Sequence, residues 1–309
     1  MTTALITHQA CLGHDTGPYH VERIARLEAV LAALSAPEFA GLARHEAPAA
    51  SLEQLALVHD RAYVEAVLAA IPARGYHGLD GDTVVSPGSG EAALRAAGAL
   101  VAAVDAVVGG AVRNAFCAVR PPGHHAEPGR AMGFCLFNNV AIAARHARSA
   151  HGLGRVAVVD FDVHHGNGTQ AAFWNDPDIL FASTHQMPLY PGTGRPSETG
   201  AGNIVNAPLP PGADGAAFRR AFEARILPAL EAFAPELVVV SAGFDAHEDD
   251  PLANLELTEA DFAWATARLA QVAARHCGGR LVSSLEGGYD LGALARSAAA
   301  HVRELMVAP

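Results

Sequence analysis

Short apolar runs alternate with amphipathic segments along most of the 309 residues of this chain. Four runs rich in valine, leucine and alanine indicate strands that are buried on both faces, as the strands of a parallel sheet are. The runs are Ala115–Val119, Val156–Val159, Leu237–Ser241 and Leu281–Leu285. Helical spacing of apolar residues marks the segments Arg23–Leu34, Glu91–Val108, Gly215–Phe233, Glu259–His276 and Asp290–Leu305. This alternation predicts an α/β fold in which helices cover both faces of a multi-stranded parallel sheet.

No Ser/Gly linker, charge run or internal repeat interrupts the pattern, so we expect one domain over residues 1–309. The segment 41–85 has the least clear secondary-structure pattern. No apolar run approaches the roughly 18–20 residues of a membrane helix, and the first residues do not resemble a signal peptide. The net charge of −11 argues against nucleic acid as a partner. Four widely spaced cysteines without a CxxC pair indicate reduced thiols and a cytoplasmic protein.

Charged and imidazole side chains gather where two of the apolar runs end. Asp160, Asp162 and His164 follow the second run, and Asp245 follows the third. Asp162 and His164 are two residues apart, so their side chains point to the same side of extended chain. Ligands of open α/β sheets bind at the carboxyl ends of the strands. Asp162, His164 and Asp245 would give a catalytic zinc site its three protein ligands and leave one position open, and these ligand types also suit Fe²⁺.

The other two runs end in groups that suit acid–base and oxyanion chemistry. His124 and His125 follow a stiff Pro-Pro-Gly turn, and imidazole titrates near neutral pH. Tyr289 follows two glycines and can present its hydroxyl to a developing oxyanion. Taken alone, the two histidines could also be exposed loop residues, and a tyrosine after two glycines is more often a packed loop residue.

Taken together and in this order, the motifs resemble those of the histone deacetylase family, and more closely its class II-like branch and bacterial relatives. The resemblance runs from about His14 to Tyr289. It implies the arginase/deacetylase fold, with the active site in loops at the strand C-termini, and zinc-dependent hydrolysis of the acyl-lysine amide with release of acetate. The matching motifs are RPPGHH (120–125), GFCLFNN (133–139), VDFDVHHGNGTQ (159–170), STHQMPLYPGTG (183–194), AGFDAHEDDPL (242–252) and LEGGYD (285–290).

The resemblance also assigns roles. Asp162, His164 and Asp245 become the zinc ligands. His125 becomes the general base and then the general acid, with His124 as its electrostatic partner, and Tyr289 donates to the carbonyl oxygen. Asp160 should accept a hydrogen bond from His124. Asn167 stands where some relatives carry an Asp partner for His125, and an amide offers that histidine no negative charge.

Potassium and the substrate tunnel follow from the same resemblance. One potassium site close to the zinc maps to Asp160, Asp162, His164, Ser183 and Thr184. A second, peripheral site maps to Phe173, Asp176, Ile179 and Asn203, mostly through backbone carbonyls. The acyl-lysine tunnel maps to Gly133, Phe134, Tyr190 and Leu252, and Arg26 matches an arginine of the acetate exit path. Leu252 stands where a polyamine-selective relative carries an acid, which favours acetylated lysine peptides or proteins as substrates.

Three other functions remain open on the sequence. An acetylpolyamine amidohydrolase shares the superfamily and the motifs. A binuclear manganese ureohydrolase shares the fold, but the carboxylates that bridge two metals are missing after Asp162. A non-catalytic acyl-lysine binding module would be expected to lose a ligand or the tyrosine, and all are present. The oligomeric state and the physiological substrate are not fixed by the sequence.

Overall fold

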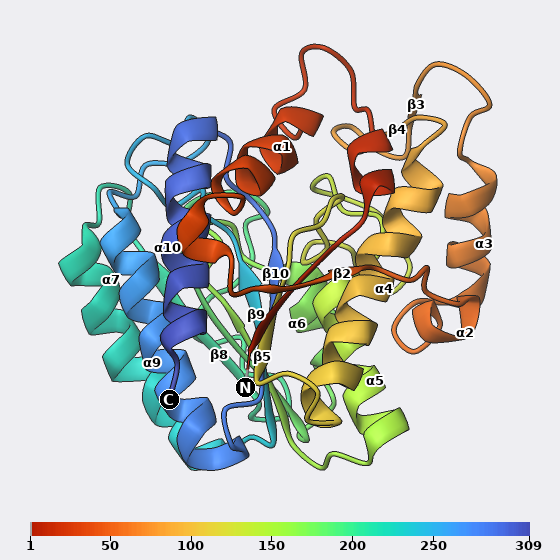
Figure 1. The fold of residues 1–309 in the computed structure, drawn as a ribbon. Coiled ribbons are helices and arrows are strands. Elements are labelled where there is room, and N and C mark those ends of the chain that lie inside the picture. The colour runs from red at the N-terminus through yellow and green to blue at the C-terminus, as the bar shows by residue number, and fades with distance from the viewer. Residues whose placement is uncertain (1) are drawn as a thin grey trace.

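The computed structural model describes residues 2–309 and is built around an eight-stranded, entirely parallel sheet (Figure 1). Four neighbouring strands in the middle of the sheet carry the motifs at their carboxyl ends. In spatial order the strands are β2 (Ala43–Glu46), β1 (Thr3–Thr7), β5 (Asn114–Cys117), β10 (Leu281–Leu285), β9 (Leu237–Ala242), β6 (Val156–Asp160), β7 (Ile179–Gln186) and β8 (Ile204–Leu209).

Helices cover both faces of this sheet (Figure 1). One face is covered by α4 (Ser89–Val108), α5 (Asn139–His151) and α6 (Asn167–Phe173). The other is covered by α1 (Ile24–Ala33), α7 (Gly215–Ala221), α8 (Leu227–Phe233), α9 (Glu259–Cys277) and α10 (Leu291–Val307). The π-helical turn Phe222–Ile226 joins α7 to α8, so the two form one interrupted helix.

Smaller elements complete the chain, most of them in the segment where the sequence showed no clear period. These are the 3₁₀ helices Gln9–Gly13 and Pro37–Phe39, the helices α2 (Leu52–Leu55) and α3 (Arg61–Ala69), and the antiparallel pair β3 (His77–Gly78) and β4 (Val84–Val85). No helix of the described residues is long and apolar enough to cross a membrane.

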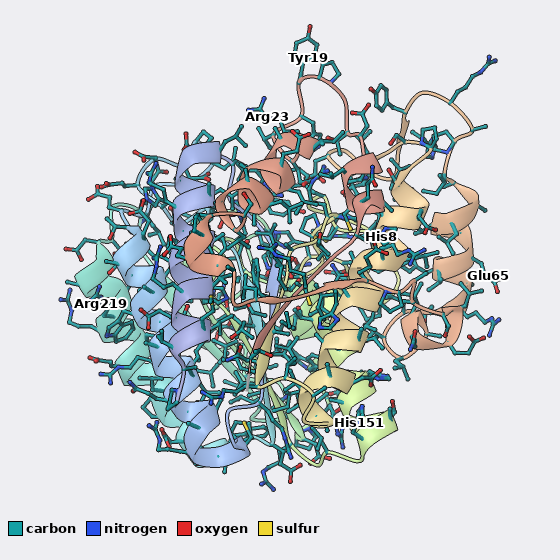
Figure 2. All side chains as sticks on the ribbon, in the orientation of Figure 1. His8, Tyr19, Arg23, Glu65, His151 and Arg219 are labelled. Atoms are coloured by element: carbon teal, nitrogen blue, oxygen red, sulfur yellow. The ribbon has the colours of Figure 1, made fainter. Side chains whose placement is uncertain are left out.

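The sheet lies between its helices so that its strand C-termini face one end of the molecule. β1 leads from the N-terminus towards the loop that carries Tyr19, and Figure 2 shows Tyr19 and His151 at opposite ends. The strands β5, β6, β9 and β10 are buried at every position, which explains their unbroken apolar runs. The predicted fold class is confirmed, and so are the four strands and the five helical segments, with shifts of a residue or two at their ends.

Candidate active site

Three metal-ligating side chains meet at the ends of β6 and β9. His164 Nδ1 lies 3.0 Å from Asp245 Oδ2 and 3.2 Å from Asp162 Oδ1. All three residues are buried, and one ligand atom of each lies within 4.8 Å of the others. Two buried carboxylates with one imidazole leave negative charge away from water, and a divalent cation compensates it. The donor set therefore fits the zinc site expected from the sequence.

The backbone closes tightly around this trio. Val163 N–H donates to Asp245 Oδ1 over 2.9 Å, and Gly287 N–H donates to Asp162 Oδ2 over 2.9 Å. A Cβ added to Gly287 would lie 2.1 Å from Asp245 Oδ2, so no side chain fits at that position. Main-chain N–H groups thus orient both carboxylates, that of Asp162 from the loop after β10 and that of Asp245 from the loop after β6.

The two histidines after β5 lie beside the trio, with their ring centroids 4.0 Å apart. His124 Nδ1 donates to Asp160 Oδ2 over 2.9 Å, and the His124 N–H donates to Glu286 Oε2 over 3.2 Å. Burial opposes the charged ring, but the carboxylates of Asp162 and Asp160 outweigh it and raise the pKa of His124 to about 10. The hydrogen bond to Asp160 therefore favours the protonated form of His124.

The pKa of His125 shifts in the opposite direction to that of His124. Burial, together with the positive charge of the neighbouring His124, lowers the pKa of His125 well below its usual value. His125 Nδ1 lies 2.8 Å from Asn167 Oδ1, while Asn167 Nδ2 donates to Glu127 Oε1 over 2.8 Å. Because the amide nitrogen faces Glu127, its oxygen accepts from His125, so Nδ1 carries the hydrogen and Nε2 keeps its lone pair. A neutral His125 with a free Nε2 is suited to take a proton.

Tyr289, His125 and His164 line a cavity of about 190 Å³. Tyr190 stacks edge-on against His125 at 5.1 Å between ring centroids, and Phe134 stacks edge-on against Tyr289 at 6.0 Å. Burial raises the pKa of the Tyr289 hydroxyl well above its usual value, so the hydroxyl stays a donor. The cavity is lined by Asp82, His125, Gly133, Phe134, His164, Leu189, Tyr190, Leu252 and Tyr289.

Comparison with known proteins agrees with this geometry. A sequence model described as the histone deacetylase domain matches residues 20–305. The chain belongs to the histone deacetylase family. It is 44% identical to Histone deacetylase 14, chloroplastic, of Arabidopsis thaliana over 96% of this chain and 75% of that protein. It is 43% identical to a Histone deacetylase-like amidohydrolase of Pseudomonas aeruginosa over 91% of this chain and 74% of that protein.

A solved structure supports the same family and fold. The crystal structure of the HDA15 HD domain superposes with a TM-score of 0.93 at 36% identity, over 99% of this chain and 88% of that chain. The resemblance inferred from the motifs is thereby confirmed. The chain is a hydrolase-family member related to deacetylases and amidohydrolases, a family that generally uses zinc.

Arg26, which was expected on an acetate exit path, lies behind the cavity of this deacetylase-family chain and not in its lining. Gly133, Phe134, Tyr190 and Leu252 all line the cavity, whereas Arg26 is fully buried behind Tyr289, with its guanidinium carbon 4.9 Å from that ring's centroid. There Arg26 pairs with the buried carboxylate Glu22, which also holds Arg120.

Three carboxylates of the deacetylase site were not identified from the sequence. Asp82 lines the cavity and accepts from Gly133 N–H over 3.1 Å. Asp250 accepts from Tyr289 N–H over 2.7 Å, and burial together with Asp245 raises its pKa to about 7. Glu127 orients Asn167, as described above. Each reaches the site from a loop. Asp250 lies within the motif 242–252, which gave it no role in deacetylation, and no motif pointed to the other two.

The inner potassium positions are brought together where β6 pairs with β7. Asp160 stands opposite Ser183 in the strand register, and Thr184 follows. Asp160 Oδ1 accepts from Asp162 N–H over 3.1 Å, and Ser183 Oγ bonds to His185 Nδ1 over 2.9 Å. Thr184 Oγ1 is buried without a hydrogen-bond partner among residues 2–309. These oxygen donors suit a hard cation.

The outer potassium positions are arranged differently. The carbonyl oxygens of Phe173, Asp176 and Ile179 all converge on Asn203 Nδ2, at 2.8, 2.9 and 2.8 Å. Asn203 Oδ1 accepts from Ala201 N–H over 3.0 Å, which fixes the amide in this orientation. The amide nitrogen therefore stands at the point where the carbonyls would coordinate an ion, and these residues fit a side-chain donor better than a cation.

Proposed function

We propose that this deacetylase-family chain hydrolyses the amide of acetyl-lysine in peptides or proteins with the help of one zinc ion. One observation carries the proposal. A narrow cavity with aromatic walls ends at a buried Asp162–His164–Asp245 trio, with a neutral imidazole and a tyrosine hydroxyl beside it. Apolar walls suit the aliphatic stem of lysine, and the polar floor suits its acyl amide.

The reaction needs the carbonyl to be polarised, water to attack, and the leaving nitrogen to gain a proton. A zinc ion held by Asp162, His164 and Asp245 would supply Lewis-acid chemistry to the carbonyl and to the attacking water. His125 takes the water's proton at Nε2 as the carbon–oxygen bond forms. His125 then returns that proton to the lysine nitrogen as the carbon–nitrogen bond breaks, which releases acetate and a free amine.

The remaining groups hold charge in place. His124 stays an imidazolium through Asp160 and stabilises the negative charge that develops on the carbonyl oxygen. Tyr289 donates its hydroxyl to that oxygen, and its backbone is fixed by Asp250. Asn167 keeps the hydrogen of His125 on Nδ1, so that Nε2 faces the substrate.

An acetylpolyamine is the second candidate substrate, and Asp82 is the observation that favours it. Its carboxylate lines the cavity, where it could pair with a polyamine ammonium. Leu252 lines the same cavity and favours a peptide. A binuclear manganese centre has less support, because the buried trio has three members and the other metal-ligating group of the described residues lies on different helices.

A comparison of rates decides between the substrates. Turnover of an acetyl-lysine peptide should exceed turnover of acetylspermidine for the zinc-loaded protein, and Asp82→Asn should leave that order unchanged. A faster reaction with acetylspermidine, abolished by Asp82→Asn, would establish the polyamine function instead. If zinc-loaded protein turned over neither substrate, a non-catalytic acyl-lysine binding module would be the better-supported function.

The ligand set has its own test. Asp162→Asn, His164→Ala and Asp245→Asn should each remove the catalytic zinc and the activity, measured by metal analysis and turnover. A variant that kept stoichiometric zinc and near wild-type activity would refute the ligand assignment. Ser183, Thr184 and Asp160 are proposed to hold one potassium ion beside this site.

The proposal also covers the domain organisation of the chain and its cellular compartment. One sheet carries every catalytic group, which supports a single domain over residues 1–309. All four cysteines, Cys11, Cys117, Cys135 and Cys277, are free and buried, which supports a reducing compartment such as the cytoplasm. The printed names of two plant relatives place those proteins in the chloroplast.

A further inference from the structure

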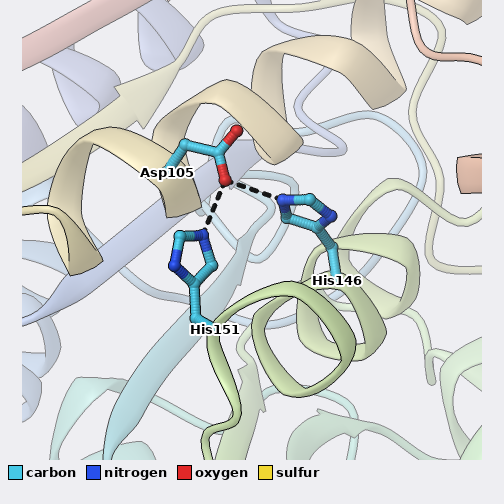
Figure 3. A group of neighbouring side chains, drawn as sticks. All are labelled: Asp105, His146 and His151. Carbon is cyan, nitrogen blue, oxygen red and sulfur yellow. Dashed lines mark hydrogen bonds and ion pairs between the residues drawn. The ribbon is translucent and has the colours of Figure 1, made fainter.

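Away from the candidate active site, two histidines of α5 and one aspartate of α4 converge on one point (Figure 3). Asp105 Oδ1 lies 2.7 Å from His146 Nε2 and 2.7 Å from His151 Nε2. The imidazole rings stand at 83° to each other, with centroids 5.7 Å apart. One ligand atom from each side chain lies within 4.8 Å of the other two. We propose that these three side chains form a peripheral site for a divalent transition-metal ion.

The site is remote from the proposed catalytic centre. α4 ends at Val108 before β5, and α5 ends at His151 before β6, so the cluster lies at the amino ends of the strands. The catalytic groups lie at the carboxyl ends. The five residues of β6 alone span about 16 Å. Figure 2 shows His151 at the end opposite the Tyr19 loop, so the peripheral ion would touch no reacting atom.

The charge balance of the cluster calls for a cation. Asp105 lies in the last turn of α4, where the negative end of the helix dipole disfavours a carboxylate. The Nε2 atoms of His146 and His151 both stand 2.7 Å from Asp105 Oδ1, so the carboxylate lies between two groups that can bind the same ion. The His146 side chain is only 11% exposed, so its ring nitrogen needs a partner in place of water. A metal ion bound at Nε2 is such a partner.

The donor set selects the class of ion. Two imidazole nitrogens and one carboxylate oxygen suit Zn²⁺, Ni²⁺ or Cu²⁺, whereas Mg²⁺ and Ca²⁺ prefer oxygen ligands throughout. The Asp105 side chain is 52% exposed and that of His151 is 24% exposed, so water can complete the coordination. Such an ion would clamp the last turns of two packed helices and stabilise the fold.

Zinc stoichiometry tests the site directly. Wild-type protein, dialysed against excess Zn²⁺ and then desalted into a weakly chelating buffer, should retain two zinc equivalents per chain. Asp105→Asn and His151→Ala should each retain one and keep wild-type turnover. Asp105→Asn is the sharper variant, because its amide oxygen still accepts hydrogen bonds from both imidazoles but is a poor metal ligand. Mg²⁺ in place of Zn²⁺ should not bind.

Two controls keep the test separate from the catalytic proposal. His276 makes a single imidazole–carboxylate pair with Glu231 at 2.7 Å, so His276→Ala should retain both equivalents. Asp245→Asn should lose the catalytic equivalent and keep the peripheral one, with a zinc-dependent rise in Tm that a second substitution, Asp105→Asn, removes. One equivalent in wild type that only Asp245→Asn removes, or two equivalents retained by Asp105→Asn, would overturn the peripheral site.

Discussion

The neutral partner of His125 gives the most direct test of how this site sets its general base. Asn167→Asp would place a negative charge about 2.8 Å from His125 Nδ1 in a buried position. At an effective dielectric constant of about 20, two unit charges about 4 Å apart interact by ~4 kcal/mol. Opposite charges at this range typically move a pKa by about one to three. The pKa of His125 should therefore rise.

The structure adds a complication that makes the test sharper. The Asn167 amide nitrogen donates to Glu127 Oε1, so an Asp in its place would set one carboxylate against another. One of the two would take up a proton, and the single variant should change little or lose stability. Asn167→Asp combined with Glu127→Gln restores a donor opposite the new carboxylate. The double variant should show the full effect.

The measurement is the pH dependence of kcat/KM on an acetyl-lysine peptide. Activity requires His125 unprotonated, so it falls as pH falls through the pKa of His125, and a raised pKa moves this acid limb to higher pH. Glu127→Gln alone is the matched control and should leave the limb in place, because Gln can still accept from Asn167. An unmoved limb in a zinc-loaded, folded double variant would remove either Asn167 from the control of His125 or His125 from the role of base.

Three further substitutions probe other parts of the chain. Tyr289→Phe should lower turnover of acetyl-lysine peptide by about 10²–10³-fold with zinc content unchanged, and a trifluoroacetyl substrate should suffer less; equal or absent losses would make Tyr289 a packing residue. Gly133→Ala, at φ +56° with its added Cβ 2.4 Å from His125 Cδ2, should displace that ring and cut turnover while zinc is retained, and normal turnover would contradict the contact. Asn203→Ala should lower the free energy of unfolding by about 1–3 kcal/mol in potassium-free buffer, since three carbonyls each lose the hydrogen bond from Asn203. Potassium should restore more stability to this variant than to wild type, and an equal response would rule out ion binding there.

Features set by residues close together in the chain can be predicted from the sequence, whereas contacts between distant segments depend on the fold. The four strands are visible as apolar runs because both faces of each are buried. The metal trio and the His124–His125 pair are visible because they directly follow those strands. The helix α5 was missed because few of its residues are strongly apolar: four of its eight buried residues are alanine and two more are the polar Asn139 and His146.

The sequence does not predict which side chains from separate loops contact each other in the folded protein. Asp250 meets Tyr289 across two loops, and Glu127 meets Asn167 from a loop on the far side of the histidine pair. Asn203 was assigned to the cluster in which it lies, but its expected role there differs from the contacts that it makes. Its backbone was expected to help hold an ion, whereas its side chain donates to the carbonyls around it. No periodicity or spacing distinguishes those two arrangements.

The strand order has a consequence for how the protein is made. β10, the last strand of the described residues to be synthesised, lies between β5 and β9. Until it inserts, the nascent chain holds two half-sheets, one with the histidine pair and one with the metal-ligating trio, and Tyr289 has not yet been added. A ribosome that stops before Leu281 should therefore release a chain with the parts of the catalyst but no assembled catalytic site. Premature termination should yield inactive fragments, with no range of partial activities between none and full.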